Sequence, residues 1–284
     1  IGTIVYTGEF GRSEERYFKG TFDGDGHQIA NLTITGRNEY VGLFGYVRNA
    51  TIQNCNVAGE VSGYNAVGGI VGAVDGKTNN ILNCSFQGNV TGNVYVGGIV
   101  GQVQNQCEVS SCYAIGTVHG GNDKVGGIAG EGRGAIKNCY ALADVSAGGK
   151  FVGGIAGDAS SVTIENCYYS GEVSARGSAG GIVGNVWRGT IQNCVSLAES
   201  VTCDFQVNRI AGDERENTSL TNNHSYNRTK LVIDGNTTYP IGGAGNNVNG
   251  ADVYISNGRV MTDVQKNEVF AWTGFDKDIW DIPT

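Results

Sequence analysis

The chain has 284 residues, a formal net charge of −8, and 47 glycines beside only 2 prolines. Nucleic acids and anionic membranes are poor partners for such a chain, because both require cationic patches and the sequence has no basic cluster. No apolar run approaches the ~20 residues of a membrane-spanning helix, so membrane insertion is not expected either.

The first 22 residues precede the regular part of the sequence, and residues 4–6 and 17–22 are typical of short strands. The run DGDGH at 23–27 resembles the start of a calcium loop. Gln28 and Ile34, however, stand where that loop needs a glycine and a bidentate glutamate. We therefore interpret the run as a sharp glycine turn and predict no metal site. Because the chain opens inside this pattern, we expect it to be a piece of a longer polypeptide with other domains.

A glycine-rich hexapeptide recurs through the middle of the chain. It reads VGGIVG at 67–72 and 96–101, VGGIAG at 125–130 and 152–157, and AGGIVG at 179–184, with degraded copies at 40–45 and 207–212. The closing glycines of successive copies lie 27, 29, 29, 27, 27 and 28 residues apart. A second motif, Ile-x-Asn-Cys, runs in phase with the first. Such a period indicates a repeat architecture, and we predict eight turns from about residue 20 to about residue 225.

Each repeat holds two or three apolar runs of four to six residues, rich in Val, Ile and Tyr and bounded by Gly, Asn, Ser and Asp. Runs this short predict strands rather than helices. A helix-free unit of ~28 residues excludes leucine-rich and helical repeats and falls short of the ~40 residues of a propeller blade. The sequence therefore predicts an all-β fold, a right-handed parallel β-helix (solenoid) over residues 1–225.

Six of the eight cysteines occupy one column of the repeat, with Leu32 and Asn223 expected at the equivalent places at its ends. The six are Cys55, Cys84, Cys112, Cys139, Cys167 and Cys194. A column that accepts leucine and asparagine predicts buried, reduced thiols that act as small apolar groups. Cys107 and Cys112 form the one pair that would merit a search for a disulfide bridge.

Neighbouring columns are expected to face the core or to stabilise bends. The residue six places after the cysteine is valine in five turns and Ser200 in the sixth, and the residue four places after it is glycine or alanine. The residue just before the cysteine is asparagine, interrupted once by Ser111. Stacked amides there can hydrogen-bond from turn to turn.

Residues 226–284 are predicted to form a C-terminal capping segment, because a solenoid needs its last coil covered. Asp234-Gly235 and Asn257-Gly258 predict hairpins, and TDVQ at 262–265 predicts the start of a short helix. Aromatic residues crowd the end of the segment.

Glu131 and Asp158 each follow a closing glycine in adjacent turns, so their carboxylates are expected to lie ~5 Å apart. A retaining glycosidase separates its two catalytic carboxylates by about that distance. Their column continues into Gln, Asn and Ala without the Lys or Arg expected in a catalytic cleft. A solvated acidic edge is therefore the simpler interpretation.

Three tyrosines follow the ladder cysteines of successive turns and are expected to form a flat row roughly 10 Å long on the outside of the solenoid. The predicted binding face contains Tyr113, Tyr140 and Tyr168, the aliphatic Ile115 and Leu142, and the acidic Asp144 and Glu172. An exposed stripe of this kind predicts a docking face for carbohydrate or protein. The alternative is that the segment after residue 225 folds back over it.

Several of these segments together resemble the GLUG-motif proteins. The resemblance lies in FKGTFDGDGH at 18–27, YVGLFG at 40–45, the VGGIVG and Ile-x-Asn-Cys series, and the ending at 272–282. It implies a bacterial cell-surface or secreted protein, often large and multidomain, with adhesin-like behaviour and no catalytic motif. It brings no functional residues of its own.

Three functions are compatible with the sequence. The leading hypothesis is a non-enzymatic extracellular or cell-surface module, without a cofactor, that binds a host or matrix glycan or a surface protein. The second is a polysaccharide lyase or hydrolase that uses Glu131 and Asp158. The third is a purely structural stalk between other domains.

Overall fold

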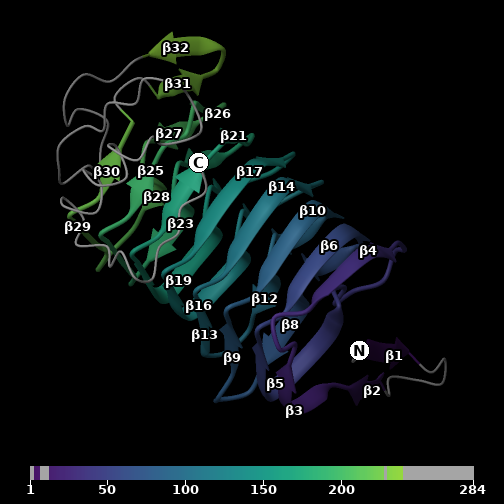
Figure 1. The fold of residues 1–284 in the computed structure, drawn as a ribbon. Coiled ribbons are helices and arrows are strands. Elements are labelled where there is room, and N and C mark those ends of the chain that lie inside the picture. Colours follow the sequence, from purple (N-terminus) through teal and green to yellow (C-terminus); the bar gives the residue numbers. More distant parts are fainter. Residues whose placement is uncertain (1–2, 7–12, 227–228, 239–284) are drawn as a thin grey trace.

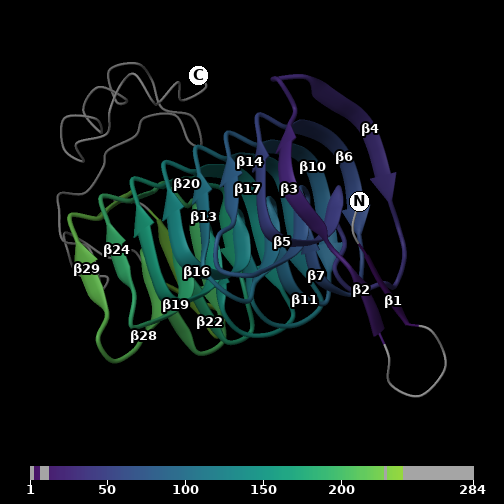
Figure 2. The ribbon, with the colours of Figure 1, turned by 90° about the horizontal axis from the view of Figure 1, so that it is seen from below.

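The structure is a computed structural model that describes residues 3–6, 13–226 and 229–238. The chain winds into a parallel β-solenoid of about eight turns (Figure 1), which confirms the predicted fold class. The turns lie side by side along one axis (Figure 2), and each complete turn adds strands to three sheets. The described residues contain no helix, and thus none long and apolar enough to cross a bilayer.

The first sheet begins close to the N-terminus and carries the acidic column. It contains β3 (Phe18–Asp23), β5 (Phe44–Gln53), β8 (Val71–Asp75), β9 (Asn80–Leu82), β12 (Val100–Val103), β13 (Cys107–Ser110), β16 (Ala129–Lys137), β19 (Ala156–Glu165), β23 (Val183–Trp187), β24 (Thr190–Gln192), β28 (Ala211–Glu214) and β29 (Ser219–Thr221).

The second sheet carries the tyrosine row. It contains β4 (Gln28–Ile34), β6 (Asn56–Ser62), β10 (Ser85–Gly92), β14 (Tyr113–Gly120), β17 (Tyr140–Ala147), β20 (Tyr168–Ser170), β21 (Glu172–Ser174), β25 (Val195–Ser196), β26 (Ser200–Cys203), β30 (His224–Ser225), β31 (Lys230–Ile233) and β32 (Asn236–Thr238).

The third sheet is made of the short strands that enter each double glycine. It contains β7 (Asn65–Gly68), β11 (Val94–Gly97), β15 (Val125–Gly126), β18 (Val152–Gly153), β22 (Ser178–Gly180) and β27 (Gln206–Asn208). A separate antiparallel pair, β1 (Thr3–Tyr6) and β2 (Ser13–Arg16), precedes the solenoid.

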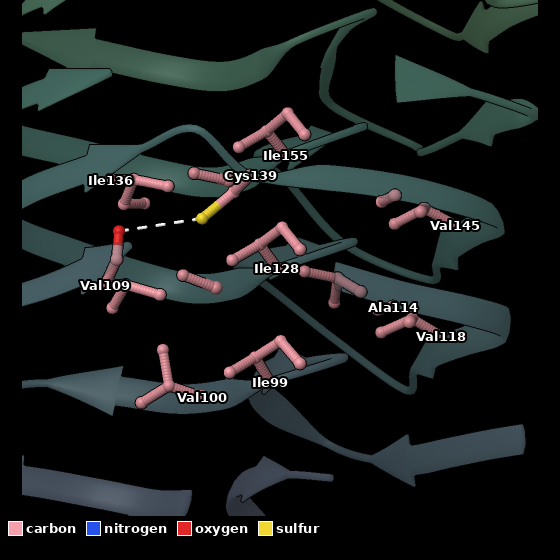
Figure 3. Packing of buried hydrophobic residues seen from close by; sticks show 14 of the residues in the cluster. Ile99, Val100, Val109, Ala114, Val118, Ile128, Ile136, Cys139, Val145 and Ile155 are labelled. Carbon is pink, nitrogen blue, oxygen red and sulfur yellow. Dashed lines mark hydrogen bonds between the residues drawn. The ribbon is translucent and has the colours of Figure 1, made fainter. Parts of the chain in front are cut away.

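The core fills the inside of the coil with columns of like side chains. The isoleucine of each glycine motif is fully buried, and Ile99, Ile128 and Ile155 stack in one such column (Figure 3). Val118 and Val145 form another column beside them (Figure 3). Because strands stack at about 4.8 Å, a repeated branched side chain packs against its own copy in every turn.

The cysteine column is part of this core. All eight cysteines are buried free thiols, as predicted for the six in the column, and Cys107 and Cys112 are therefore not bridged. Thiols along the column donate weak hydrogen bonds to nearby carbonyl oxygens; Cys139 Sγ, for example, lies 3.5 Å from the Val109 oxygen (Figure 3). Burial raises the pKa of the Cys55 thiol to about 12 and that of Cys167 well above the ordinary value.

The asparagine column forms the bend before each cysteine. Asn54, Asn83 and Asn166 have φ of 52°, 50° and 52°, in the left-handed region that asparagine tolerates better than most residues. The predicted amide ladder is present: Asn83 Nδ2 donates to Asn54 Oδ1 at 2.8 Å, and Asn166 Nδ2 to Asn138 Oδ1 at 3.2 Å. The column thus satisfies both the backbone and the side chains of the bend.

Two predicted columns are misaligned near the ends of the solenoid. Leu32 lies opposite Gly59 and not in the cysteine column, because β4 begins with Gln28 opposite Asn56 and carries a bulge between Ile29 and Leu32. The DGDGH run supplies the first bend instead, and the Gly26 N–H donates to the Asn54 oxygen at 3.0 Å. At the other end, the buried Val201 pairs with Val173, so a one-residue insertion displaces Ser200 from the valine column.

The parallel arrangement continues beyond residue 225, because β31 pairs in parallel with β26. Asp234 and Gly235, with φ of 47° and 76°, form the predicted hairpin turn between β31 and β32. The second predicted hairpin, the short helix and the aromatic ending lie outside the described residues.

Candidate functional site

The tyrosine row lies on the outer face of the second sheet. β14 pairs in register with β17, and β17 with β20, so that Tyr113, Tyr140 and Tyr168 occupy equivalent places in successive turns. The rings of Tyr113 and Tyr140 stack with centroids 4.8 Å apart and planes inclined by 4°. The ring of Tyr168 is 6.5 Å from that of Tyr140 and tilted by 44°. The flat ladder is therefore two rings long rather than three.

The three tyrosines also differ in burial. Tyr113 and Tyr140 are half-buried, whereas Tyr168 is only 1% exposed. Burial raises the pKa of the Tyr168 hydroxyl above its ordinary value. The expectation of three exposed rings is thus wrong for Tyr168, because strand alternation gives the face of the sheet but not what covers that face. Tyr113 and Tyr140 are the accessible part of the row.

The other predicted binding residues lie beside the stacked rings. Ile115 and Leu142 are in register on β14 and β17 and are both half-buried. Asp144 is half-buried, and its Oδ1 accepts a hydrogen bond from the backbone N–H of Glu172 at 3.1 Å. The Glu172 side chain is exposed. Aromatic, aliphatic and acidic groups therefore share one accessible face.

A hollow of about 330 Å³ opens at the Tyr113 end of this face. It is lined by Gly26, Gln28, Asn56, Val57, Ser85, Gln87, Tyr113 and Ile115. Ser85 Oγ donates to Asn56 Oδ1 at 2.7 Å, and Asn56 Nδ2 donates to the Gly26 oxygen at 3.1 Å. The lining combines hydrogen-bonding groups with an aromatic ring and carries no charged side chain.

The polar lining of this hollow was not predicted from the sequence. A signal was available, since Asn56 and Ser85 occupy the tyrosine column in the two turns before Tyr113. Gln28 lies in the same column, opposite Asn56, but the expectation that Leu32 stands in the cysteine column places Gln28 elsewhere.

The second candidate site is the acidic pair on the first sheet. Glu131 on β16 and Asp158 on β19 are in register, and their side chains are only 6% and 7% exposed. Lys124 lies between them, with Nζ 3.3 Å from Glu131 Oε1 and 2.7 Å from Asp158 Oδ2. Arg133 Nη2 is 3.7 Å from Glu131 Oε1.

These contacts correct two expectations. The acids do not form a solvated edge, and basic partners do accompany them. Lys124 was not predicted as a partner because it does not belong to the acidic column. It lies in the bend just before β15, on the other side of the double glycine from Glu131. Burial lowers the pKa of Lys124, but the hydrogen bond to Asp158 and the charges of both acids outweigh this effect and raise it above the ordinary lysine value.

The remaining neighbours of the acidic pair are also hydrogen-bond donors. Gln102 Nε2 donates to Glu131 Oε2 at 3.0 Å, and Asn185 Nδ2 donates to Asp158 Oδ1 at 2.7 Å. The general acid of a glycosidase needs surroundings that keep its proton on, such as an apolar pocket. Donors on every side suit two carboxylate anions instead. In the described part of the chain, no group of three or more His, Cys, Asp or Glu side chains is placed to hold a metal ion.

The fold defines the chain as a parallel β-solenoid of about eight turns. The GLUG motif matches residues 92–118, and the chain is therefore a GLUG-containing protein, as its resemblance implied. No curated protein matches the chain.

Two solved structures share the fold. A candidate immunoglobulin A1 protease from Bacteroides ovatus is 24% identical, with a TM-score of 0.61 over 93% of this chain and 76% of that chain. An IgA1 protease is 16% identical, with a TM-score of 0.55 over 90% of this chain and 20% of that chain. At these identities the likeness establishes the fold alone.

Proposed function

We propose that the chain is a non-enzymatic binding module of a larger secreted or surface-attached bacterial protein. Its ligand contact is the face around Tyr113 and Tyr140, and its partner is a host or matrix glycan or a surface protein. The observation that carries the proposal is the stacked, half-buried pair of rings beside a polar hollow.

The chemistry of this face suits a ligand with flat apolar surfaces and hydroxyl or amide groups. Two parallel rings present a rigid apolar platform at low entropic cost, and Ile115 and Leu142 extend it. The amides of Asn56 and Gln87 in the hollow offer donors and acceptors for orientation, as in many small-molecule sites. Glu172 lies towards the polar rim, where charged groups contribute more to specificity than to affinity.

Two findings support the role of a module. Nearly the whole chain aligns with a fifth of the IgA1 protease structure, so a solenoid of this kind is one part of that larger protein. The GLUG motif agrees with the surface placement that the family resemblance implies.

The proposal is tested by presenting the purified chain to an array of glycans and bacterial and host surface proteins. Tyr113→Ala should reduce binding at least several-fold, because the ring lines the hollow and supports the stack. Tyr64→Ala is the matched control, since Tyr64 is 49% exposed and lies outside the face. Equal binding by both variants would exclude this face as the contact, and no binding by the wild type would favour a structural stalk.

An enzymatic function is the second candidate. It is favoured by the in-register pair Glu131 and Asp158 and by the protease names of the two structural neighbours. Reducing-sugar release from a polysaccharide panel, and cleavage of immunoglobulin A1 on gels, measure the two activities. Cleavage by the wild type that disappears in Asp158→Asn would establish this candidate in place of the binding module.

A further inference from the structure

Lys124 and Asp158 are placed for a covalent reaction. The amino nitrogen lies 2.7 Å from one carboxyl oxygen of Asp158, and a second carboxylate, Glu131, lies 3.3 Å from the same nitrogen. We propose that Lys124 and Asp158 form an intramolecular isopeptide bond, with Glu131 as the proton acceptor. The bond would link two consecutive turns of the solenoid.

The bend before the double glycine delivers the lysine to this position. Lys124 has φ of 63°, and Tyr95 and Phe151, at the equivalent places in the neighbouring turns, have φ of 59° and 65°. This conformation holds Lys124 beside the acidic column, with Nζ 5.1 Å from the centroid of the Tyr95 ring. The lysine is 21% exposed and both acids less than 10%, so the three groups are fixed and largely screened from water.

The reaction balances without a further reactant. Glu131 takes a proton from the ammonium group, and the Nζ electron pair attacks Cγ of Asp158 to form the C–N bond. Negative charge on Oδ1 of the tetrahedral intermediate is stabilised by Asn185 Nδ2 at 2.7 Å and Ser160 Oγ at 3.2 Å, which already bond that oxygen.

The bond from Cγ to Oδ2 then breaks. Oδ2 leaves as water with two protons, one returned by Glu131 and one lost from the nitrogen. One ammonium and one carboxylate thus give one amide and one water.

The starting state is an ion pair, so the reactive amine is the minor form of Lys124. Held at contact distance, reacting groups reach effective molarities on the order of 10⁵–10⁸ M, which offsets that small fraction. We therefore expect slow maturation of the folded chain and no reaction in the unfolded chain, where the groups lie far apart.

Mass spectrometry of the purified, aged chain tests the proposal. The mature protein should be lighter than its sequence by one water, and a tryptic digest should contain the peptides of Lys124 and Asp158 joined together. A succinimide at an Asp-Gly pair would give the same loss of mass, but it would persist in Lys124→Arg. The cross-link and its loss of water should be absent from Lys124→Arg and strongly slowed in Glu131→Gln.

Two further variants sharpen the test. Lys137→Arg alters the partly exposed pair of Lys137 with Glu165, 3.7 Å apart, and should leave the cross-link unchanged. Asp158→Asn should form the same amide with loss of ammonia, so its mature mass should equal that of the mature wild type. A wild-type chain that keeps its full mass and yields separate peptides after prolonged incubation would overturn the proposal, and the cluster would be an ion pair only.

Discussion

At the scale of single residues, the asparagine bends combine two properties. Asn166 adopts φ of 52°, where a residue with a Cβ atom ordinarily costs about 1–2 kcal/mol. Its side chain also donates to Asn138 in the turn before. Asparagine tolerates the left-handed region and its amide hydrogen-bonds the equivalent asparagine of the neighbouring turn, which explains why asparagine recurs at this position in nearly every repeat.

Asn166→Ala should therefore lower the free energy of unfolding by about 1–2 kcal/mol, because it keeps the strained φ and loses the amide hydrogen bond. Asn166→Gly removes the strain and should cost less. Denaturant titration of the two variants measures the difference. Equal losses, or a greater loss for glycine, would contradict this account of the bend.

The glycine column on the second sheet reflects close approach of two strands. A Cβ atom on Gly88 would clash with the carbonyl oxygen of Gly59 in the preceding turn, and its φ of 142° lies where side chains are rarely found. Gly88→Ala should destabilise the chain by roughly 3 kcal/mol, since β6 and β10 must separate. Gly26→Ala is the control.

At Gly26, φ is 71° and nothing lies within 4 Å of the added atom, so only about 1 kcal/mol of backbone strain is expected. Thermal unfolding of the two variants gives the comparison. A Gly88 variant as stable as the Gly26 variant would show that the strands can separate without cost.

At the scale of the element, the cysteine column is a row of thiols that folding keeps protonated. Burial raises the pKa of Cys55 and Cys107 to about 12, and those of Cys112 and Cys139 well above the ordinary value. In the unfolded chain each thiol titrates near 8.5. The unfolded state therefore loses protons first as the pH rises.

Because the folded-state pKa is raised, the contribution of these thiols is fully present below about pH 8.5 and is lost as the pH rises towards the folded-state pKa. The free energy of unfolding should thus fall by up to about 1.4 kcal/mol per pH unit for each buried thiol. Denaturation at about pH 7 and about pH 10 measures the fall. Tyrosine and lysine also titrate in this range, so Cys139→Ala is compared at both values. Between the two pH values, the free energy of unfolding of Cys139→Ala should fall by less than that of the wild type. An identical fall would contradict the burial of the cysteine column.

The elements also show how far the sequence alone could lead. The repeated residues predict the strands, the bends and the core columns, because the side chains of each turn must pack against those of the turn before it. The repeat pattern does not predict the bulge at Leu32 or the insertion before Val201, since each changes the strand register in one turn only. The contact of Lys124 with the acidic pair and the burial of Tyr168 could not be predicted for another reason. Both depend on contacts between different columns, and the periodicity within one column gives no information about these.

At the scale of the whole molecule, the three sheets enclose a large hydrophobic core that contains all eight thiols. Without reductant or denaturant, a thiol reagent should react slowly with the native chain. In denaturant, still without reductant, the count should be six or more of the eight cysteines. A count of two or fewer would mean that the ladder is oxidised, and would contradict the predicted free thiols.

The central claim is that this rod presents a binding face at Tyr113 and Tyr140, and it is tested most directly at Tyr140. Affinity for the ligand found by array screening is measured by calorimetric titration of the wild type and Tyr140→Ala, together with their melting temperatures. The account predicts binding weaker by about 1–3 kcal/mol with a nearly unchanged melting temperature. A large fall in melting temperature, equivalent to about 3 kcal/mol or more, with no change in binding would contradict it and make the tyrosine pair part of the packing.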